Sequence, residues 1–230
     1  MKIYADNRLL SLGVVCGTVS RHAGNMKEPS NQNALYGQLG IPPERILHLH
    51  QTHSETLLSV LTEQDARAVQ AAPVRDADGW ILQPAGWGVA ILTADCIPLF
   101  VWDEKAGLVG LSHCGWRGVV KGLPGKTARE LKKAGAKGRL QAYVGPHIQS
   151  CCFEVQQDVA DRFRPEFVLH KNGKLFVDLN QEVFRQLEEA GLRPEDIQAP
   201  YYCTCGDKEN FFSWRRDHEK VNLLSFIYKP

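Results

Sequence analysis

Reactive side chains concentrate in four short segments, and each segment follows an apolar, strand-like run. The segments are residues 48–53, 93–96, 113–118 and 145–147. A rigid scaffold commonly displays its functional groups at such places, where a strand opens into a loop. The histidines and cysteines of these segments are residue types that bind metals or take part in nucleophilic catalysis.

Imidazole and thiolate ligands together suit zinc. Three of them, His53, Cys96 and His113, leave a fourth tetrahedral position for water, and zinc lowers the pKa of such a water towards neutrality. The three residues form no local metal motif, but ligands at three strand ends can meet in space. The residue types therefore predict one mononuclear metal site, with zinc as the expected ion and copper as the alternative.

Other interpretations of these residues stay open at this point. Cys96 alone could be a small buried hydrophobic residue, and with His113 it could form a thiolate–imidazole nucleophile pair that needs no metal. His48 and His50 share one face of a predicted strand and are interpreted as half-buried histidines. Asp95 directly precedes the candidate ligand Cys96 and could orient another group or carry a proton.

Two arginines follow an aromatic run near the end of the sequence. Arg215 and Arg216 come directly after residues 211–214, and their guanidinium groups could hold a phosphate or a carboxylate. A salt bridge to Asp217 is an alternative of equal weight.

The seven cysteines favour free thiols over a disulfide framework. Cys151 and Cys152 are adjacent, which suits cross-linking poorly. Cys203 and Cys205 are too close together for the usual paired zinc-ligand loop, so we expect them on opposite faces of a strand.

Strands and helices that must position these residues are interleaved without a regular order. Helices are predicted at residues 31–39, 63–71, 125–133 and 180–190, the last one capped by Asn180. A further helix, capped by Ser150, is predicted from the four-residue spacing of Val155, Val159 and Phe163. Strands are predicted at 46–49, 56–61, 79–83, 88–93, 97–102, 108–112, 141–144, 176–179, 199–204, 211–214 and 223–228. The chain is therefore predicted to be a single mixed α+β domain over residues 1–230.

The composition is that of an ordinary globular protein, with 43% hydrophobic and 23% charged residues in 230. A net charge of +1 provides no global field that would recruit nucleic acid or anionic lipid. The sequence opens without a signal-peptide pattern and contains no apolar run long enough to span a bilayer. We therefore expect a cytoplasmic protein with a small-molecule substrate and with neither a nucleic-acid nor a membrane partner.

Taken together, these segments resemble the laccase-domain family, which is also described as the purine nucleoside phosphorylase or peptidoglycan-editing-factor family. The similarity runs from about Leu12 to Tyr228, and its motifs occur in the same order. The motifs are Gln51-Thr52-His53, Thr93-Ala94-Asp95-Cys96-Ile97-Pro98, His113-Cys114-Gly115-Trp116-Arg117-Gly118, Gly145-Pro146-His147-Ile148, Phe153-Glu154-Val155, Asp178-Leu179, Cys203-Thr204 and Phe211-Phe212-Ser213-Trp214-Arg215-Arg216-Asp217.

The resemblance implies a fold of two packed β-sheets flanked by helices, with the site in a surface cleft. It also implies a metal bound by His53, Cys96 and His113, the same residues that the ligand chemistry proposes. Family members are described as zinc enzymes that cleave adenosine, inosine or methylthioadenosine with phosphate and that deaminate adenosine. The partners implied for this chain are therefore a purine nucleoside and phosphate.

Each of these reactions assigns roles to residues of this chain. Deamination needs an activated water to attack the purine C6 while an acid protonates the leaving amine, and Asp95 is the candidate acid. Phosphorolysis needs phosphate near the ribose C1′, where Arg117, Arg215 or Arg216 could place it. His147 is a further candidate for substrate binding.

Other activities linked to the family give alternative hypotheses. Cys96 and His113 could serve a peptidoglycan-precursor amidase, as a nucleophile pair or as ligands of a hydrolytic zinc. Altered loops could leave a metal- or nucleoside-binding module of weak activity. Copper-dependent phenol oxidation fits least well, because it needs several coppers with many histidines and the chain has eight histidines in total.

The sequence departs from the family's pattern near both ends. Residues 17–24 replace a Ser-Leu-Asn-Leu-Gly-like loop, and residues 218–222 replace a Gly-x-Thr-Gly-Arg stretch. Gln32 and Asn222 thereby stand where positive charges are expected near the anion site. This loss weakens the expectation of phosphorolysis but leaves the three metal ligands intact.

Overall fold

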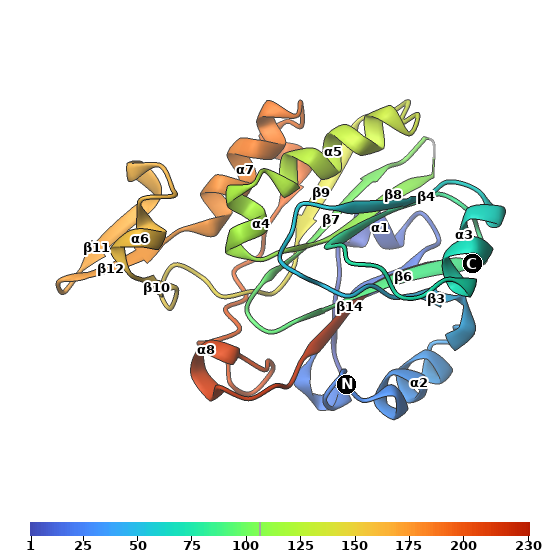
Figure 1. The fold of residues 1–230 in the computed structure, drawn as a ribbon, viewed down its shortest axis with the longest axis horizontal. Helices are drawn as coiled ribbons and strands as arrows, with labels where there is room; N and C mark the ends of the chain where they lie inside the picture. Colours follow the sequence, from blue (N-terminus) through green and yellow to red (C-terminus); the bar gives the residue numbers. More distant parts are fainter. Residues whose placement is uncertain (106) are drawn as a thin grey trace.

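Two β-sheets pack face to face between layers of helices in the computed structural model, which describes residues 1–105 and 107–230 (Figure 1). The first sheet has the strand order β1 (Ile3–Tyr4), β2 (Val15–Val19), β14 (Leu223–Lys229), β6 (Trp87–Thr93) and β3 (Ile46–Leu47). The second has the order β13 (Ile197–Gln198), β9 (Leu140–Val144), β7 (Ile97–Asp103), β8 (Leu108–Cys114), β5 (Gly79–Leu82) and β4 (Leu57–Val60).

Helices cover the outer faces of the two sheets. The outer face of the second sheet is covered by α4 (Trp116–Val120), α5 (Leu123–Lys133) and α7 (Leu179–Glu189) (Figure 1). The first sheet packs its outer face on α2 (Pro29–Gln38). The other helices are α1 (Asn7–Leu10), α3 (Glu63–Ala71), α6 (Gln157–Ala160) and α8 (Trp214–Asp217).

A small three-stranded sheet projects from the side of this body, at the left of Figure 1. Its strand order is β10 (Glu154–Val155), β12 (Lys174–Val177) and β11 (Val168–Lys171). The helix α6 lies beside it. The chain enters this projection directly from the 145–153 segment, so the projection is attached next to two of the motifs singled out in the sequence.

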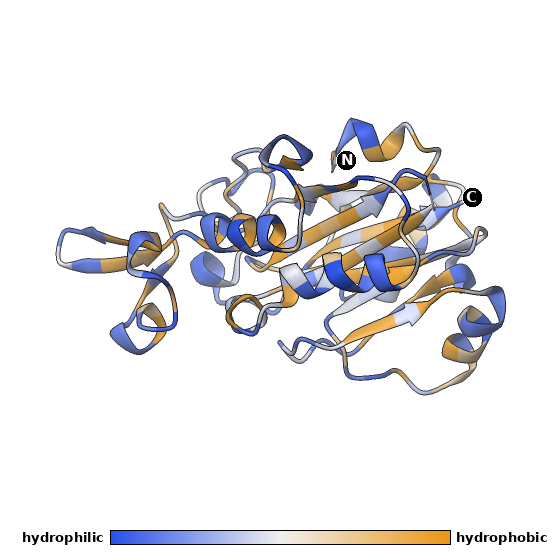
Figure 2. Ribbon diagram, turned by 90° about the horizontal axis from the view of Figure 1, so that it is seen from above, coloured by the Kyte–Doolittle hydropathy of each residue, from blue (hydrophilic) through white to orange (hydrophobic). Residues whose placement is uncertain are grey.

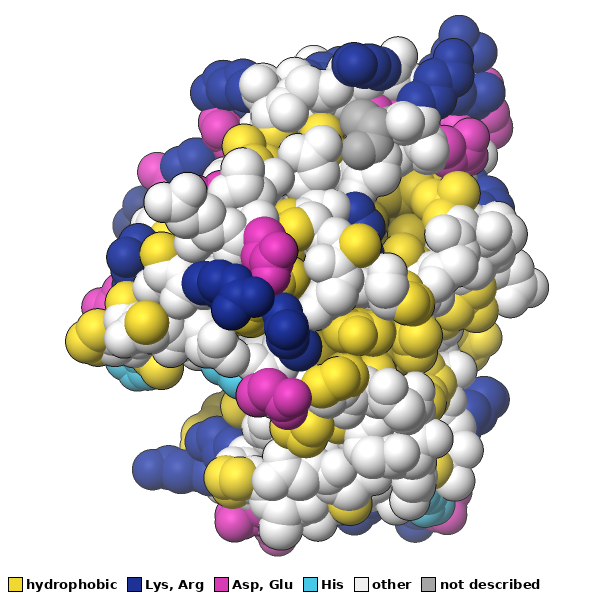
Figure 3. Space-filling view, turned by 90° about the vertical axis from the view of Figure 1, so that its right-hand side faces the viewer, with side chains coloured by type: hydrophobic (Ala, Val, Ile, Leu, Met, Phe, Trp, Pro, Cys, Tyr) yellow, Lys and Arg dark blue, Asp and Glu magenta, His cyan; other side chains and the backbone are white. Residues whose placement is uncertain are grey.

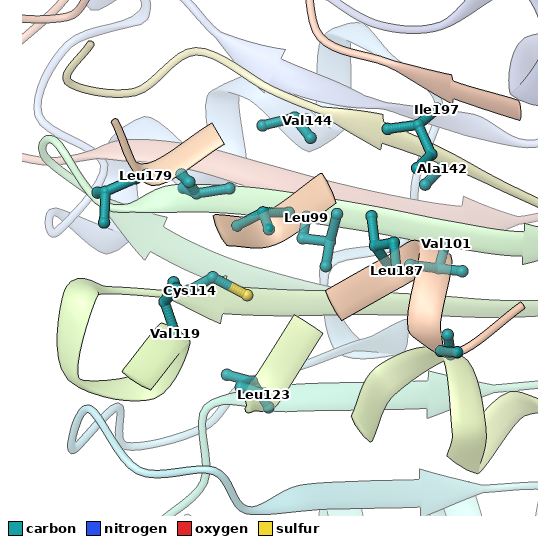
Figure 4. Close-up of a cluster of buried hydrophobic side chains, with 14 of the residues drawn as sticks. Leu99, Val101, Cys114, Val119, Leu123, Ala142, Val144, Leu179, Leu187 and Ile197 are labelled. Carbon is teal, nitrogen blue, oxygen red and sulfur yellow. The ribbon is translucent and has the colours of Figure 1, made fainter. Parts of the chain in front are cut away.

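Period-two alternation divides the apolar residues of the strands between the layers. In β7, Leu99 and Val101 face the helices of the second sheet (Figure 4). Phe100 and Trp102 face the first sheet. Both faces of this strand are buried, which is why its sequence is a continuous apolar run. Figure 2 shows the same pattern as hydrophobic strands flanked by helices whose outer surfaces are hydrophilic.

These observations confirm the predicted α+β class, with two packed sheets between helices. The predicted helix at residues 63–71 coincides with α3, whose N-terminus is closed by a capping box between Thr62 and Asp65. The helix predicted from Asn180 is α7, but its cap is Asp178, whose side chain accepts hydrogen bonds from two backbone amides of the first turn.

The predicted helix with Val155, Val159 and Phe163 on one face is wrong. Val155 lies in β10, where it pairs with Leu175 of β12, and only Gln157–Ala160 is helical. The four-residue spacing of apolar residues therefore reflects burial in two successive elements rather than one helical face. Three apolar residues at a four-residue spacing are too few to distinguish one helix from a strand followed by a helix.

The strands predicted at residues 199–204 and 211–214 are also wrong. Residues 199–204 form a loop in which Cys203 makes an isolated bridge to His147, and Cys205 lies in the turn that follows. Residues 211–213 lead into α8, with Ser213 as its cap. Hydrogen bonds to side chains, described below, replace the ladder that these segments would need as strands.

The surface carries charges of both signs. Figure 3 shows Lys and Arg side chains next to Asp and Glu side chains on one face, around a strip of hydrophobic side chains. Over the described residues, no helix has the length and apolar character needed to cross a membrane.

Candidate metal centre

Two of the predicted ligands lie where the chain crosses from one sheet to the other. His53 is on the connection from β3 to β4, and Cys96 is on the connection from β6 to β7. Each crossing needs a residue in the left-handed region, at φ 57° for His53 and 87° for Asp95. Non-glycine residues in this region cost roughly 1 to 3 kcal/mol and concentrate at functional sites.

The third ligand, His113, extends from β8 one residue before the strand ends. The structure brings the three predicted ligands together: their ligand atoms all lie within 4.8 Å of one another. Cys96 Sγ is 3.8 Å from His53 Nε2, and the two imidazole rings are 4.8 Å apart in an edge-to-face arrangement. Two imidazole nitrogens and one sulfur at this separation fit the donor set of a tetrahedral zinc ion with an open position.

Gly115 leaves the space that this cluster needs. A Cβ atom at this position would lie 2.6 Å from His53 Cδ2 and 3.0 Å from Cys96 Sγ. Every other residue type would therefore push a carbon into the cluster. The glycine thus lets the backbone approach two of the three ligands closely.

Asp78, which the sequence analysis did not single out, organises the cluster from behind. Its fully buried carboxylate accepts hydrogen bonds from His113 Nδ1 at 2.8 Å and from the backbone amide of His53 at 3.0 Å. The same carboxylate accepts from the amide and the hydroxyl of Ser54. With Nδ1 donating to Asp78, His113 presents Nε2 as its ligand atom. An aspartate before a strand usually indicates a turn, so the sequence carried no signal for this role.

The neighbouring charges in the cluster shift the pKa values of Cys96 and His113 in opposite directions. Burial opposes the charge on Cys96, but the His113 imidazolium and hydrogen bonds from both histidines outweigh it and lower the pKa of Cys96 to about 6. Burial likewise opposes the charge on His113, but Cys96 and Asp78 raise its pKa to about 9. The Cys96 sulfur is therefore held as a thiolate, the form that binds metals and attacks electrophiles.

The cluster opens into a cleft of about 690 Å³. Drug-sized ligands occupy cavities of this order. Three aromatic side chains line it, those of Trp116, Phe153 and Trp214. The basic side chains along the cleft are Lys27, Arg117, Arg215 and Lys220.

Two predicted substrate-binding arginines, Arg117 and Arg215, thus lie in the cleft. Arg117 stacks over Trp116 at 4.4 Å from the ring centre. Arg215 lies over Phe153 and donates to the backbone carbonyl of Glu154 at 2.6 Å. The guanidinium of Arg215 is therefore held in place by the wall of the cleft.

The structure places the other two predicted substrate-binding residues away from the described lining of the cleft. Arg216 donates to the carbonyls of Thr204, Cys205 and Phe211 and forms an ion pair with Asp217. The salt bridge that the sequence analysis gave as an alternative is present.

His147 is buried beneath the surface, where its ring donates to the carbonyl of Gly145. Burial lowers the pKa of His147 to about 4, so the ring is neutral. In the motif that contains it, His147 fixes the backbone of a loop rather than lining the cleft.

Asp95 lines the cleft but uses its carboxylate on the chain itself. Its oxygens accept hydrogen bonds from Thr204 Oγ1 at 2.6 Å, from Ser213 Oγ at 3.0 Å and from the backbone amide of Arg215 at 2.7 Å. The crossing between the two sheets is in this way tied to the segment that carries Arg215.

The two positions with expected positive charges contain neutral residues, of which Asn222 lines the cleft. Gln32 donates to the carbonyl of Met26, and the backbone amide of Asn222 donates to Asn25. Lys27 and Lys220 lie close to these positions in sequence and line the cleft. These two lysines therefore add to the positive charge that Arg117 and Arg215 bring to the cleft.

The chain is similar to several known proteins in sequence and in fold. A family model described as multi-copper polyphenol oxidoreductase laccase matches residues 19–228. The purine nucleoside phosphorylase YlmD of Geobacillus stearothermophilus is 29% identical over 94% of this chain and 90% of its own length. Its crystal structure superimposes with a TM-score of 0.85 over 94% of this chain and 92% of that one. The adenosine deaminase RL5 of an unknown prokaryotic organism is 32% identical over 78% of this chain and 72% of its own length. The chain therefore belongs to the multi-copper polyphenol oxidoreductase laccase family, the laccase-domain family that its motifs resemble.

Proposed function

We propose that this chain is a zinc-dependent enzyme that acts on purine nucleosides. It deaminates adenosine and cleaves adenosine, inosine or methylthioadenosine with phosphate. The observation that carries the proposal is the cluster of His53, Cys96 and His113 at a cleft lined by both aromatic and basic side chains. The names of the relatives YlmD and RL5 support the same substrate class.

In this proposal His53, Cys96 and His113 hold the metal, and Asp78 fixes the orientation of His113. A zinc ion bound there supplies Lewis acidity and makes water a stronger nucleophile at neutral pH. Copper is the alternative occupant of the same ligands, because affinity alone favours it over zinc.

The lining of the cleft offers contacts for both reactants of phosphorolysis, the purine nucleoside and phosphate. Trp116, Phe153 and Trp214 offer ring faces for a purine, and Trp214 is 49% exposed and so accessible to a ligand. Arg117 and Arg215, with the two lysines of the cleft, provide the positive charge that phosphate needs.

The contacts of Asp95 favour a positioning role over that of a proton carrier. Three donors from the 204–215 segment occupy its carboxylate, so a proton transfer at this group would cost hydrogen bonds that hold Arg215 in the cleft. We therefore propose that Asp95 positions the segment that carries Arg215, and that it does not protonate the leaving amine.

The test is metal content and turnover of the purified chain beside Cys96→Ser and His113→Ala. The control is His170→Ala, which removes an exposed histidine on β11 of the projecting sheet. We expect about one zinc at the cluster in wild type, conversion of adenosine to inosine, and phosphate-dependent release of free base. Both activities should be lost in the two cluster variants and kept in the control. Full adenosine turnover in either cluster variant would contradict the proposal.

A second candidate function is supported by a specific observation. Cys96, His113 and Asp78 lie in the order nucleophile, base and orienting carboxylate, and the pKa values of Cys96 and His113 favour a thiolate–imidazolium pair. This arrangement suits an amidase that acts on peptidoglycan precursors. Turnover of a muropeptide precursor that survives metal chelation and disappears in Cys96→Ser would establish it.

We also propose that residues 1–230 act as one cytoplasmic domain with small-molecule partners. The two sheets share a core built from strands at both ends of the sequence, which supports a single cooperative unit. One unfolding transition, seen alike by circular dichroism and tryptophan fluorescence, would be expected. Two separated transitions would divide the chain into domains.

A further inference from the structure

A second cluster of thiols lies outside the candidate metal centre. Cys151 and Cys152 follow each other in a turn, and Cys203 comes from a turn that is distant in the sequence. The sulfur of Cys151 is 3.3 Å from that of Cys152 and 3.6 Å from that of Cys203, and all three sulfurs lie within 4.8 Å of one another. In the sequence these cysteines form no common motif, because Cys151 and Cys152 are adjacent and Cys203 is far from both.

The distances suit ligands around one ion better than a covalent pair. Bonded sulfurs are about 2.05 Å apart. Three thiolates around an ion at about 2.3 Å lie about 3.8 Å apart, so the sulfurs of Cys152 and Cys203 would each have to move by about half an ångström or less relative to that of Cys151. A vicinal pair plus a third thiol also provides one more sulfur than a disulfide would use.

Two backbone amides point at the sulfur of Cys203. The backbone amide of Gly206 donates to Cys203 Sγ at 3.3 Å, and the backbone of Gln149 donates to the same sulfur. Amide donors stabilise negative charge on sulfur when a soft metal binds.

We propose that Cys151, Cys152 and Cys203 form a second metal site, for a thiophilic d¹⁰ cation, Cu⁺ or Zn²⁺. Soft thiolate ligands select these ions over harder ones. Cu⁺ is satisfied by three thiolates, whereas Zn²⁺ takes a fourth ligand, for which Cys205 in the same turn is the nearest thiol in sequence. This site is distinct from the cluster at the cleft and does not depend on the function proposed for it.

A metal at the second site would join two segments that shape the cleft. The carbonyl of Cys152 accepts from Arg215, and the carbonyl of Cys205 accepts from Arg216. Binding would fix the 151–152 turn to the 203–206 turn and so stiffen the wall that holds Arg215. The expected consequence is structural and appears as metal-dependent stability.

The test separates the two sites by their number of thiolates. Reduced, metal-free Cys96→Ser protein is titrated with Co²⁺, whose charge-transfer absorption grows with the number of bound thiolates, and with Cu⁺ against a chromophoric chelator. The same titrations are made in the Cys96→Ser background with Cys151→Ser, which changes an exposed side chain and spares the core. Cys16→Ala is the matched control for loss of a thiol elsewhere. Cys205→Ser removes the candidate fourth ligand, which only a four-coordinate ion needs.

We expect one equivalent bound with a three-thiolate spectrum in Cys96→Ser, and at least a tenfold loss of affinity when Cys151→Ser is added. The Cys16→Ala control should bind like its parent. Weakened Co²⁺ and Zn²⁺ binding with unchanged Cu⁺ binding in Cys205→Ser would show a fourth ligand for the divalent ions. In otherwise wild-type protein, total bound metal should fall by one equivalent on Cys151→Ser.

Three outcomes would overturn the proposal. The first is no thiolate absorption in Cys96→Ser protein whose remaining thiols are all titratable. The second is equal affinity with and without Cys151→Ser. The third is a Cys151–Cys203 disulfide, found by mass spectrometry of peptides, that persists when stoichiometric metal is present during reduction and refolding.

Discussion

At the scale of single residues, the candidate metal centre depends on groups that touch its ligands as much as on the ligands themselves. Asp78 contributes no ligand atom, yet its carboxylate fixes the ring of His113 and the backbone of His53. Loss of such an orienting carboxylate costs roughly 10- to 100-fold in metal affinity or activity in other metal sites.

We therefore expect Asp78→Asn to weaken zinc binding by roughly 10- to 100-fold. An amide has one accepting oxygen where the carboxylate has two, so the donors to the other oxygen lose their acceptor, and it carries no charge to balance His113. Competition with a zinc chelator measures the effect. The control is Asp76→Asn, which changes an exposed carboxylate paired with His50. Equal losses in both variants would show that Asp78 has no special role.

Gly115→Ala tests the space inside the cluster. The new Cβ would lie 2.6 Å from His53 and 3.0 Å from Cys96, so one ligand must move away. We expect loss of the metal with little loss of fold, measured as metal content and circular dichroism. The control is Gly37→Ala in α2, where a Cβ meets nothing within 4 Å and should stabilise the helix by roughly 0.5 to 1 kcal/mol. Metal retained in Gly115→Ala would refute this account of the glycine.

At the scale of elements, the helix layer is tied to the candidate centre through α4 and α7. Gln186 of α7 donates to Glu182 and to the carbonyl of Val119 in α4, the helix that starts directly after Gly115. Glu182 also accepts two hydrogen bonds from Arg185. Burial raises the pKa of Glu182, but the bonds from Arg185 and Gln186 outweigh it, so the pKa lies below its ordinary value.

This shift predicts a pH dependence of stability. Because the folded-state pKa of Glu182 is lowered, its contribution is present above the ordinary glutamate pKa of 4.5 and is lost as the pH falls through the folded-state pKa. We expect Glu182→Gln to lower the melting temperature at pH 7 and to melt like wild type once the pH is below that range. Glu189→Gln, at an exposed partner of Arg185, should change little at either pH. A difference between Glu182→Gln and wild type that grows on acidification would contradict the assignment.

At the scale of the whole molecule, the candidate centre joins the two sheets. His53 and Cys96 lie on the crossings between them, and His113 lies in a strand of the second sheet. A metal bound to all three would hold the two layers together at one edge. Binding to the folded state alone adds about 2.7 kcal/mol when the free metal is 100 times its Kd.

Chelation should therefore lower the melting temperature of the wild-type chain by about 5 to 10 °C, given a shift of roughly 2 to 4 °C per kcal/mol at this size. Scanning calorimetry with and without chelator measures the shift. In Cys96→Ser the shift should shrink, and the difference belongs to the candidate centre. The same shift in both proteins would mean that metal at this centre does not stabilise the fold.

Residue type and order alone determined several features of this protein. The ligands His53, Cys96 and His113 could be named because few other residue types bind zinc, and because each follows an apolar strand. The buried strands β6 and β7 and the helix α3 were predictable because period, apolar run and capping are local properties. The family followed from the order of motifs along the chain.

Only the tertiary structure decided which of these residues meet. Asp78 became part of the centre because β5 and β8 are neighbours, and Cys151 met Cys203 because two distant turns pack together. From the sequence, Arg216 is a candidate for phosphate binding and Asp95 a candidate acid, but their side chains satisfy backbone and side-chain donors and acceptors of the 204–217 segment. The physical reason is that hydrogen-bond partners and metal ligands are chosen by distances in space. A local sequence pattern constrains only the few residues that are close along the chain.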